Sequence, residues 1–214
     1  MVVLKDLFID VNGIQLEAEY LHSTTDNEFA VIICHPHPQY GGSMHNNVVS
    51  AVFSRLKMEN INCLRFNFRG VGNSSGSPSD GVGELEDVKA CVEYLVGEKH
   101  YEKILICGYS YGAAIGCSAV NYSKHIVGFV AISFPWDFMD ENFKKLSQTG
   151  KPKFFIQGDE DSIAKYNRFQ EHYDDYQEPK EYTIIKGANH FYRSYEHQVA
   201  EEVHKFIKKN YSLD

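Results

Sequence analysis

Residues 108–112 read Gly-Tyr-Ser-Tyr-Gly and place one serine between two glycines. Four apolar residues run directly into this pentad, and small residues follow it. The pattern predicts a buried strand, a tight turn that carries Ser110, and a helix packed closely against the sheet. A serine on such a turn presents its hydroxyl beside the free N–H groups at the start of a helix, where it can act as a nucleophile.

A serine nucleophile needs a base that takes its proton and a carboxylate that orients the base. Among the ten histidines, His190 has the expected position, because it follows the last predicted strand and precedes the last predicted helix. If it is the base, activity should rise with pH through about 6 to 7 as the imidazole loses its proton. Three carboxylates compete for the third role. Asp161 is favoured because it stands far enough beyond the penultimate strand to swing back towards His190. Asp159 is expected to cap the turn, and Asp137 would need a less usual placement.

Strand-like and helix-like segments alternate along the chain. Strands are expected at residues 2–10, 14–21, 29–34, 62–68, 104–107, 126–133, 154–157 and 181–186, and helices at about 45–58 (capped by Ser43), 83–96, after the serine turn, up to about 176, and near the C-terminus. Asn12-Gly13 predicts a hairpin between the first two strands. The alternation predicts an α/β fold, with a mostly parallel sheet covered by helices on both faces and an antiparallel hairpin at its N-terminal edge. We expect one domain over residues 1–214.

The composition is that of an ordinary globular protein, with 43% hydrophobic and 23% charged residues and a net charge of -8. No basic stretch dominates, so we expect neither nucleic acid nor a membrane as a partner. No secretory signal pattern is recognisable, and no apolar run approaches the roughly 18 residues of a membrane span. The five cysteines are never spaced C-x-x-C. They are expected to be small buried residues of a cytoplasmic protein.

Three histidines, His35, His37 and His45, lie close enough in sequence to suggest a metal site. Prolines hold His35 and His37 on an extended segment, where alternate side chains point apart. No carboxylate or cysteine stands at ligand spacing beside them. We therefore expect no metal, and the serine chemistry requires no cofactor.

The order Ser110, Asp161, His190 on successive strand ends resembles that of the α/β-hydrolase superfamily. Residues 67–74 (Asn-Phe-Arg-Gly-Val-Gly-Asn-Ser) resemble the superfamily's F-R-G-x-G-x-S turn. Residues 35–44 resemble the corresponding loop of small, lidless members related to dienelactone hydrolases and prolyl-oligopeptidase-type esterases. The resemblance covers nearly the whole chain. It implies an α/β-hydrolase fold and a Ser-His-Asp acyl-enzyme mechanism.

Turn geometry and this resemblance together imply an oxyanion hole made of backbone N–H groups. The N–H of Tyr111, directly after the nucleophile, is expected to be the first donor. The second should come from residues 35–44, whose prolines have no N–H. His37, Gln39 and Tyr40 are the candidates, and Gln39 is preferred.

Superfamily members with a lid insert it where this chain has only residues 137–152, a connection too short for more than one small helix. An open pocket walled by Tyr40, Tyr111, Trp136 and Phe191 is therefore expected. This favours a carboxylesterase or thioesterase that acts on a small-molecule acyl substrate over a lipase. The alternatives are a peptidase of the prolyl-oligopeptidase type and a non-catalytic binding or scaffold protein on the same fold.

Overall fold

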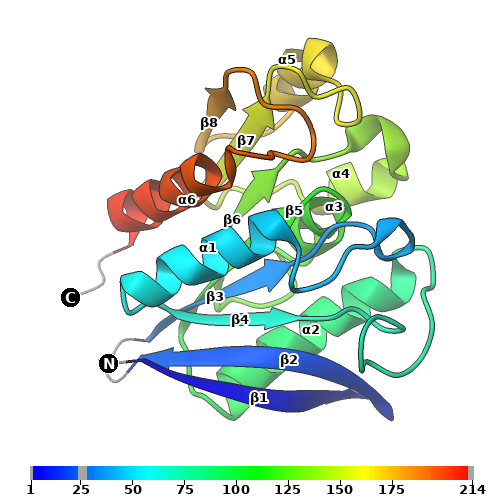
Figure 1. Ribbon diagram of the computed structural model, residues 1–214, viewed down its shortest axis with the longest axis vertical. Coiled ribbons are helices and arrows are strands. Elements are labelled where there is room, and N and C mark those ends of the chain that lie inside the picture. Colours follow the sequence, from blue (N-terminus) through cyan, green and yellow to red (C-terminus); the bar gives the residue numbers. More distant parts are fainter. Residues whose placement is uncertain (1, 24–27, 212–214) are drawn as a thin grey trace.

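The computed structural model describes residues 2–23 and 28–211. Its centre is an eight-stranded sheet with the order β1-β2-β4-β3-β5-β6-β7-β8 (Figure 1). The first two pairings, β1 with β2 and β2 with β4, are antiparallel, and all the others are parallel. The predicted sheet with its N-terminal hairpin is confirmed. The strands are β1 (Val2–Val11), β2 (Ile14–Ser23), β3 (Phe29–Cys34), β4 (Asn62–Phe66), β5 (Lys103–Tyr109), β6 (Ile126–Ile132), β7 (Lys153–Gly158) and β8 (Lys180–Ile185).

Helices cover both faces of the sheet (Figure 1). On one face lie α1 (Asn47–Met58) and α6 (Glu196–Asn210), which also pack against each other. On the other face lie α2 (Val82–Gly97), α3 (Tyr111–Ser118), α4 (Glu141–Leu146) and α5 (Tyr166–Asp174). Because both faces are covered, the central strands read as continuous apolar runs rather than as alternating patterns.

The core lies in two layers, one on each side of the sheet. Every residue of β3 is buried, as is β5 after Lys103. The five cysteines are all buried and unpaired. Burial raises the pKa of the Cys107 thiol to about 12, so this thiol stays protonated and packs as a small apolar side chain. The predicted role of the cysteines as buried residues is confirmed; the cytoplasmic location stays a prediction.

Most element boundaries differ from those expected by one or two residues, and two of the differences have a clear local cause. The side chain of Asn46 accepts the Val48 N–H at 3.0 Å and caps α1, so the helix begins after Asn46. The predicted cap, Ser43, instead accepts the His45 N–H at 3.3 Å, in the turn before the helix. Strand β4 ends two residues early because the chain leaves the sheet at Asn67.

The connection between β6 and β7 contains a 3-10 turn, Trp136–Phe138, and the six-residue helix α4. It inserts no lid over the edge of the sheet, as predicted. Within the described part of the chain, no helix combines the length and the apolar character that a bilayer span requires.

Candidate active site

The serine pentad forms a sharp turn between β5 and α3. Ser110 has φ 55° and ψ -122°, a strained conformation for a residue with a side chain. A Cβ on Gly108 would lie 2.3 Å from the Gly112 carbonyl oxygen, and one on Gly112 would lie 2.4 Å from that of Cys34. Both glycines are therefore required by close backbone approach, as the sequence predicts. The turn holds the Ser110 hydroxyl at the carboxyl end of the central strand.

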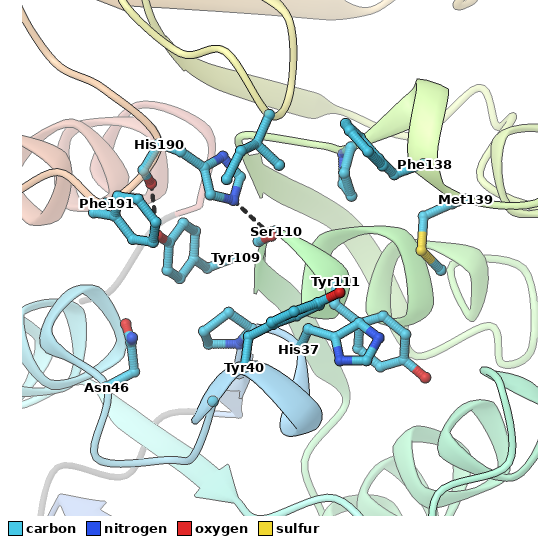
Figure 2. A pocket seen from close by; sticks show the side chains of 14 residues that line it. His37, Tyr40, Asn46, Tyr109, Ser110, Tyr111, Phe138, Met139, His190 and Phe191 are labelled. Carbon is cyan, nitrogen blue, oxygen red and sulfur yellow. Dashed lines mark hydrogen bonds between the residues drawn. The ribbon is translucent and has the colours of Figure 1, made fainter.

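His190 lies on the loop between β8 and α6 and reaches back to the serine. Its Nε2 is 2.8 Å from Ser110 Oγ (Figure 2). Its Nδ1 is 2.8 Å from Asp161 Oδ2. Since a carboxylate can only accept, Nδ1 carries the proton, and Nε2 is free to accept the serine proton. The Tyr109 hydroxyl donates to the His190 carbonyl at 2.6 Å and ties the histidine loop to the serine turn.

Asp161 follows β7, and its side chain is completely shielded from solvent. Oδ1 accepts the backbone N–H groups of Ile163 and Ala164 at 2.9 and 2.8 Å. Oδ2 is left to face His190. The protein backbone therefore fixes the plane of the carboxylate before the imidazole binds to it.

The other two carboxylates have different partners. Asp137 lies 3.2 Å from His172 Nε2 and 3.4 Å from an Arg168 guanidinium nitrogen, away from the serine. Asp159 accepts the Gly187 N–H at 2.6 Å and braces the start of the loop that carries His190. The structure thus brings Ser110, His190 and Asp161 together and leaves the two alternatives outside this chain of hydrogen bonds.

Two further residues, one bonded to Asp161 and one bonded to that residue, carry no sequence motif. Ser133 Oγ donates to Asp161 Oδ2 at 2.7 Å and lies 2.7 Å from the hydroxyl of Tyr192. Ser133 and Tyr192 are both completely buried, with φ 47° and 51°. A strand ending in serine and a tyrosine two residues after the histidine are the only sequence signals, and neither predicts contact with the acid.

The loop after β3 supplies backbone N–H groups near Ser110, but Gln39 is not among them. Gln39 lies exposed, and its N–H donates to His37 Nδ1 at 3.2 Å. The Tyr40 N–H donates to the His37 carbonyl at 3.1 Å. Within the described residues, the N–H groups of His37 and Tyr111 have no hydrogen-bond partner. The 3-10 turn uses the N–H groups that follow His37, which counts against Gln39 and leaves the His37 N–H as the free candidate; the identity of the second oxyanion donor stays a prediction.

His35, in the same loop, is buried and structural. Its Nδ1 donates to the Pro36 carbonyl at 2.6 Å, and its Nε2 accepts the Phe68 N–H at 3.0 Å. Burial, the largest cause, lowers the pKa of His35 to about 4. Both ring nitrogens are occupied by protein groups, which leaves neither for a metal ion. Among the described residues, no group of three or more His, Cys, Asp or Glu side chains could hold one.

A pocket of about 460 Å³ opens in front of Ser110. In Figure 2, His190 and Phe191 lie on one side of the serine, with Tyr40, His37 and Tyr111 opposite, and Phe138 and Met139 at a third side. Three of the four predicted walls line it: Tyr40, Tyr111 and Phe191. Trp136 does not, because its ring stacks on Phe134 and His172 behind the pocket. Phe138 takes the place expected of Trp136.

The pocket wall carries little charge. No lysine, arginine, aspartate or glutamate is among the described residues that line it. Burial lowers the pKa of His37, although Glu84 and Asp80 partly oppose this by attracting the protonated ring. The charged groups that act on the His37 ring are therefore acidic.

A serine at the sharp turn after the central strand, with a histidine and an aspartate on the last two strand ends, is the arrangement of an α/β hydrolase. A family model described as an alpha/beta hydrolase domain matches residues 28–210, and the chain belongs to this family.

Individual relatives support the assignment. An uncharacterised protein of Rickettsia prowazekii is 32% identical over 207 residues, which span 92% of this chain and 87% of the relative. A structure of an alpha-beta serine hydrolase homologue from Coxiella burnetii is 29% identical, with a TM-score of 0.86 over 97% of both chains. A serine hydrolase without a lid from Xanthomonas campestris shares the fold, with a TM-score of 0.87, 24% identity and coverage of 96% of this chain and 94% of that one.

Proposed function

We propose that this hydrolase cleaves small esters or thioesters through a covalent acyl-enzyme on Ser110. The observation that carries the proposal is the continuous chain from Ser110 Oγ to His190 and from His190 to Asp161, with both distances 2.8 Å. All three side chains are buried beneath the pocket floor or line it, so little reorganisation is needed before reaction.

In the first step, His190 Nε2 takes the Ser110 proton as Oγ attacks the carbonyl carbon of the substrate. The imidazolium that forms is stabilised by the Asp161 carboxylate. The negative charge that develops on the carbonyl oxygen is bound by the unpaired N–H groups of Tyr111 and His37. Preorganised backbone donors of this kind typically contribute about 10²–10³ in rate each.

In the second step, His190 returns the proton to the leaving alkoxide or thiolate, and the carbon–oxygen or carbon–sulfur bond breaks. A water molecule then enters, gives a proton to His190, and attacks the acyl-enzyme. The proton returns to Ser110 Oγ when the acid leaves. Overall, one water is consumed, and the atoms balance without a cofactor.

The pocket favours an uncharged, apolar substrate. Aromatic and aliphatic side chains line it, including Tyr40, Phe138, Met139 and Phe191, and no described lining residue is a cation that could pair with a carboxylate. Burying an unpaired carboxylate there would cost several kcal/mol. The open mouth and the 460 Å³ volume suit a compact acyl group rather than a folded polypeptide.

An active-site-directed fluorophosphonate tests the proposal directly. We expect the wild-type protein to be labelled at Ser110 and the S110A variant to remain unlabelled. Labelling absent from the wild type would support the non-catalytic binding or scaffold alternative. Cleavage of a peptide bond in preference to an ester would support the peptidase alternative.

A matched pair of substrates tests the charge preference. p-Nitrophenyl butyrate and the p-nitrophenyl monoester of succinic acid have acyl chains of equal length and differ in one carboxylate. We expect kcat/KM to favour the butyrate by at least about 100-fold, as an unpaired buried charge implies. Equal rates would contradict it. A butyryl thioester beside the butyrate ester then decides between esterase and thioesterase.

A further inference from the structure

The Asp161 carboxylate has a second hydroxyl partner that the transfer of the Ser110 proton does not use. Ser133, directly after β6, donates to Oδ2 at 2.7 Å, the same oxygen that receives the His190 Nδ1 proton at 2.8 Å. The Tyr192 hydroxyl lies 2.7 Å from Ser133 Oγ. Because the Ser133 proton points to the carboxylate, Tyr192 is the donor to Ser133, and the Ile156 carbonyl lies farther from the Tyr192 hydroxyl, at 3.4 Å.

These contacts close a ring of hydrogen bonds and main chain that runs from Asp161 through Ser133, Tyr192 and His190 back to Asp161. Tyr192 follows His190 by two residues, so one short loop reaches the same carboxylate oxygen twice. His190 reaches it directly, and Tyr192 reaches it through Ser133. Ser133 and Tyr192 are both 0% exposed. A buried polar network in which each member has its partner holds its members rigidly.

Both residues that complete the ring have a strained backbone. Ser133 has φ 47° and Tyr192 has φ 51°, in the left-handed region where glycine is favoured. Such conformations persist where the surrounding structure over-determines them, and they cluster at functional sites. Here the two strained residues touch each other through their hydroxyl groups, and the Ser133 hydroxyl touches the acid. Glycine at either position would relieve the strain but lose the hydroxyl.

We infer that Ser133 and Tyr192 are positioning residues for the reaction proposed above: they hold Oδ2 of Asp161, and through it the ring of His190, in line with Ser110. The inference rests on the proposed hydrolase function. The N–H groups of Ile163 and Ala164 already hold Oδ1. With Ser133 on Oδ2, both oxygens are fixed when His190 accepts the serine proton.

The Ser133 hydroxyl also acts electrostatically. Its positive end faces the oxygen that attracts the His190 proton, so it moderates the pull of the carboxylate on a protonated imidazole. Loss of Ser133 should therefore shift the pH dependence of Ser110 reactivity, which a purely structural residue would not do.

The test uses S133G, because glycine suits the positive φ and keeps the fold. The readout is the second-order rate constant for fluorophosphonate labelling of Ser110 between pH 5 and 9, which needs no knowledge of the substrate. We expect the plateau rate to fall about tenfold through loss of orientation. The acid limb should move to higher pH by about half a unit.

Y192F supplies a second, independent variant that removes one oxygen atom. Its effect should be smaller than that of S133G and in the same direction. The double variant S133G/Y192F should behave like S133G alone, because Tyr192 acts through Ser133. Matched controls are S118A and Y176F. Ser118 bonds backbone carbonyls of the α3–α4 region, and Tyr176 bonds Trp136 and Ser147, all away from Asp161. Both controls should leave the pH profile unchanged.

An S133G profile that superimposes on the wild type would overturn the inference. So would additive effects in the double variant, or a shift of the acid limb in the controls. If the wild type is not labelled at all, the proposed hydrolase function fails instead. The low-field resonance of the proton on His190 Nδ1 then still reports on the hydrogen-bond ring through Ser133 and Tyr192. Its chemical shift should change in S133G and Y192F and stay the same in both controls.

Discussion

His35 and His190 are both buried at the carboxyl ends of the parallel strands, yet their hydrogen-bond partners give them different chemical properties. His35 lies between the Pro36 carbonyl and the Phe68 N–H. His190 lies between the Asp161 carboxylate and the Ser110 hydroxyl. Backbone partners on both nitrogens hold His35 in one neutral tautomer. A carboxylate on one side and a hydroxyl on the other let an imidazole accept a proton and return it. The hydrogen-bond partners, more than burial, therefore distinguish His35, which holds its loop in place, from His190, the proposed base.

The largest expected effect comes from replacing each histidine by glutamine. H190Q should lower fluorophosphonate labelling and ester hydrolysis by about 10³–10⁴-fold, with little change in thermal stability. H35Q should do the reverse. It should lower the free energy of unfolding by about 1–3 kcal/mol and leave the activity of the folded fraction within about tenfold. Labelling and hydrolysis rates, together with urea unfolding of both variants, check this prediction. Equal losses of activity in H190Q and H35Q would contradict the proposed difference between the two histidines.

Removing the carboxylate partner should turn His190 into a poor base. D161N should lower hydrolysis by about 10³-fold, because an amide cannot stabilise the imidazolium and permits the wrong tautomer. Asp137 is the matched control, since its partners are His172 and Arg168. D137N should stay within about threefold of wild type by the same assay. Comparable losses of activity in D161N and D137N would contradict the role of Asp161 as the carboxylate that orients His190.

A third histidine, His37, should contribute through its backbone rather than its ring. Its φ of -55° suits proline. H37P therefore removes the N–H with little change in the loop, whereas H37A removes the ring and keeps the N–H. We expect H37P to lower kcat by about 10²-fold and H37A by only a few-fold. Because both variants lack the imidazole, equal losses in H37P and H37A would show that the ring matters and the amide does not.

The last prediction concerns stability at low pH. The pKa of His35 is about 4 in the folded protein and 6.5 without burial. Between these values the unfolded chain binds more protons, so the free energy of unfolding falls as the pH falls from 6.5 to 4. The full loss is about 3 kcal/mol, and this group contributes no slope above pH 6.5. Urea unfolding measured at several pH values between 4 and 6.5 gives the free energy of unfolding as a function of pH. In H35Q this free energy should depend less steeply on pH than in the wild type, and an unchanged pH dependence would contradict the prediction.

Much of the fold is predictable from the sequence because the signals are long and repeated. The buried runs of β3 and β5 and the turn at Asn12-Gly13 each allow one interpretation, and the sheet follows from their order. The serine turn is predictable because Gly108 and Gly112 are forced by backbone contact. His190 and Asp161 come together because the last two parallel strands end side by side.

The loop after β3 shows where such prediction stops. Choosing Gln39 treats this loop as extended, whereas a 3-10 turn at Pro38–Tyr40 directs the Gln39 N–H into the His37 ring. Hydrogen bonds within a turn depend on dihedral angles that composition does not determine. The same holds for Trp136, which a single turn carries behind the pocket while Phe138 faces it. Ser133 and Tyr192 meet only because two strained residues from separate loops converge on one carboxylate.

The contact between Gly112 and the carbonyl of Cys34 fixes the backbone around Ser110, whereas the side chains at the rim of the pocket are free to vary. The turn that carries Ser110 rests directly on the backbone that leads into His37, with no side chain between them. The spacing of the His37 and Tyr111 N–H groups, the proposed oxyanion donors, is therefore set by direct contact between two stretches of main chain. Tyr40, Phe138 and Phe191 lie at the rim and are 88%, 64% and 56% exposed. Substitutions there can change substrate preference while the reaction centre keeps its dimensions, which makes the rim the natural place for this chain to diverge or to be re-engineered.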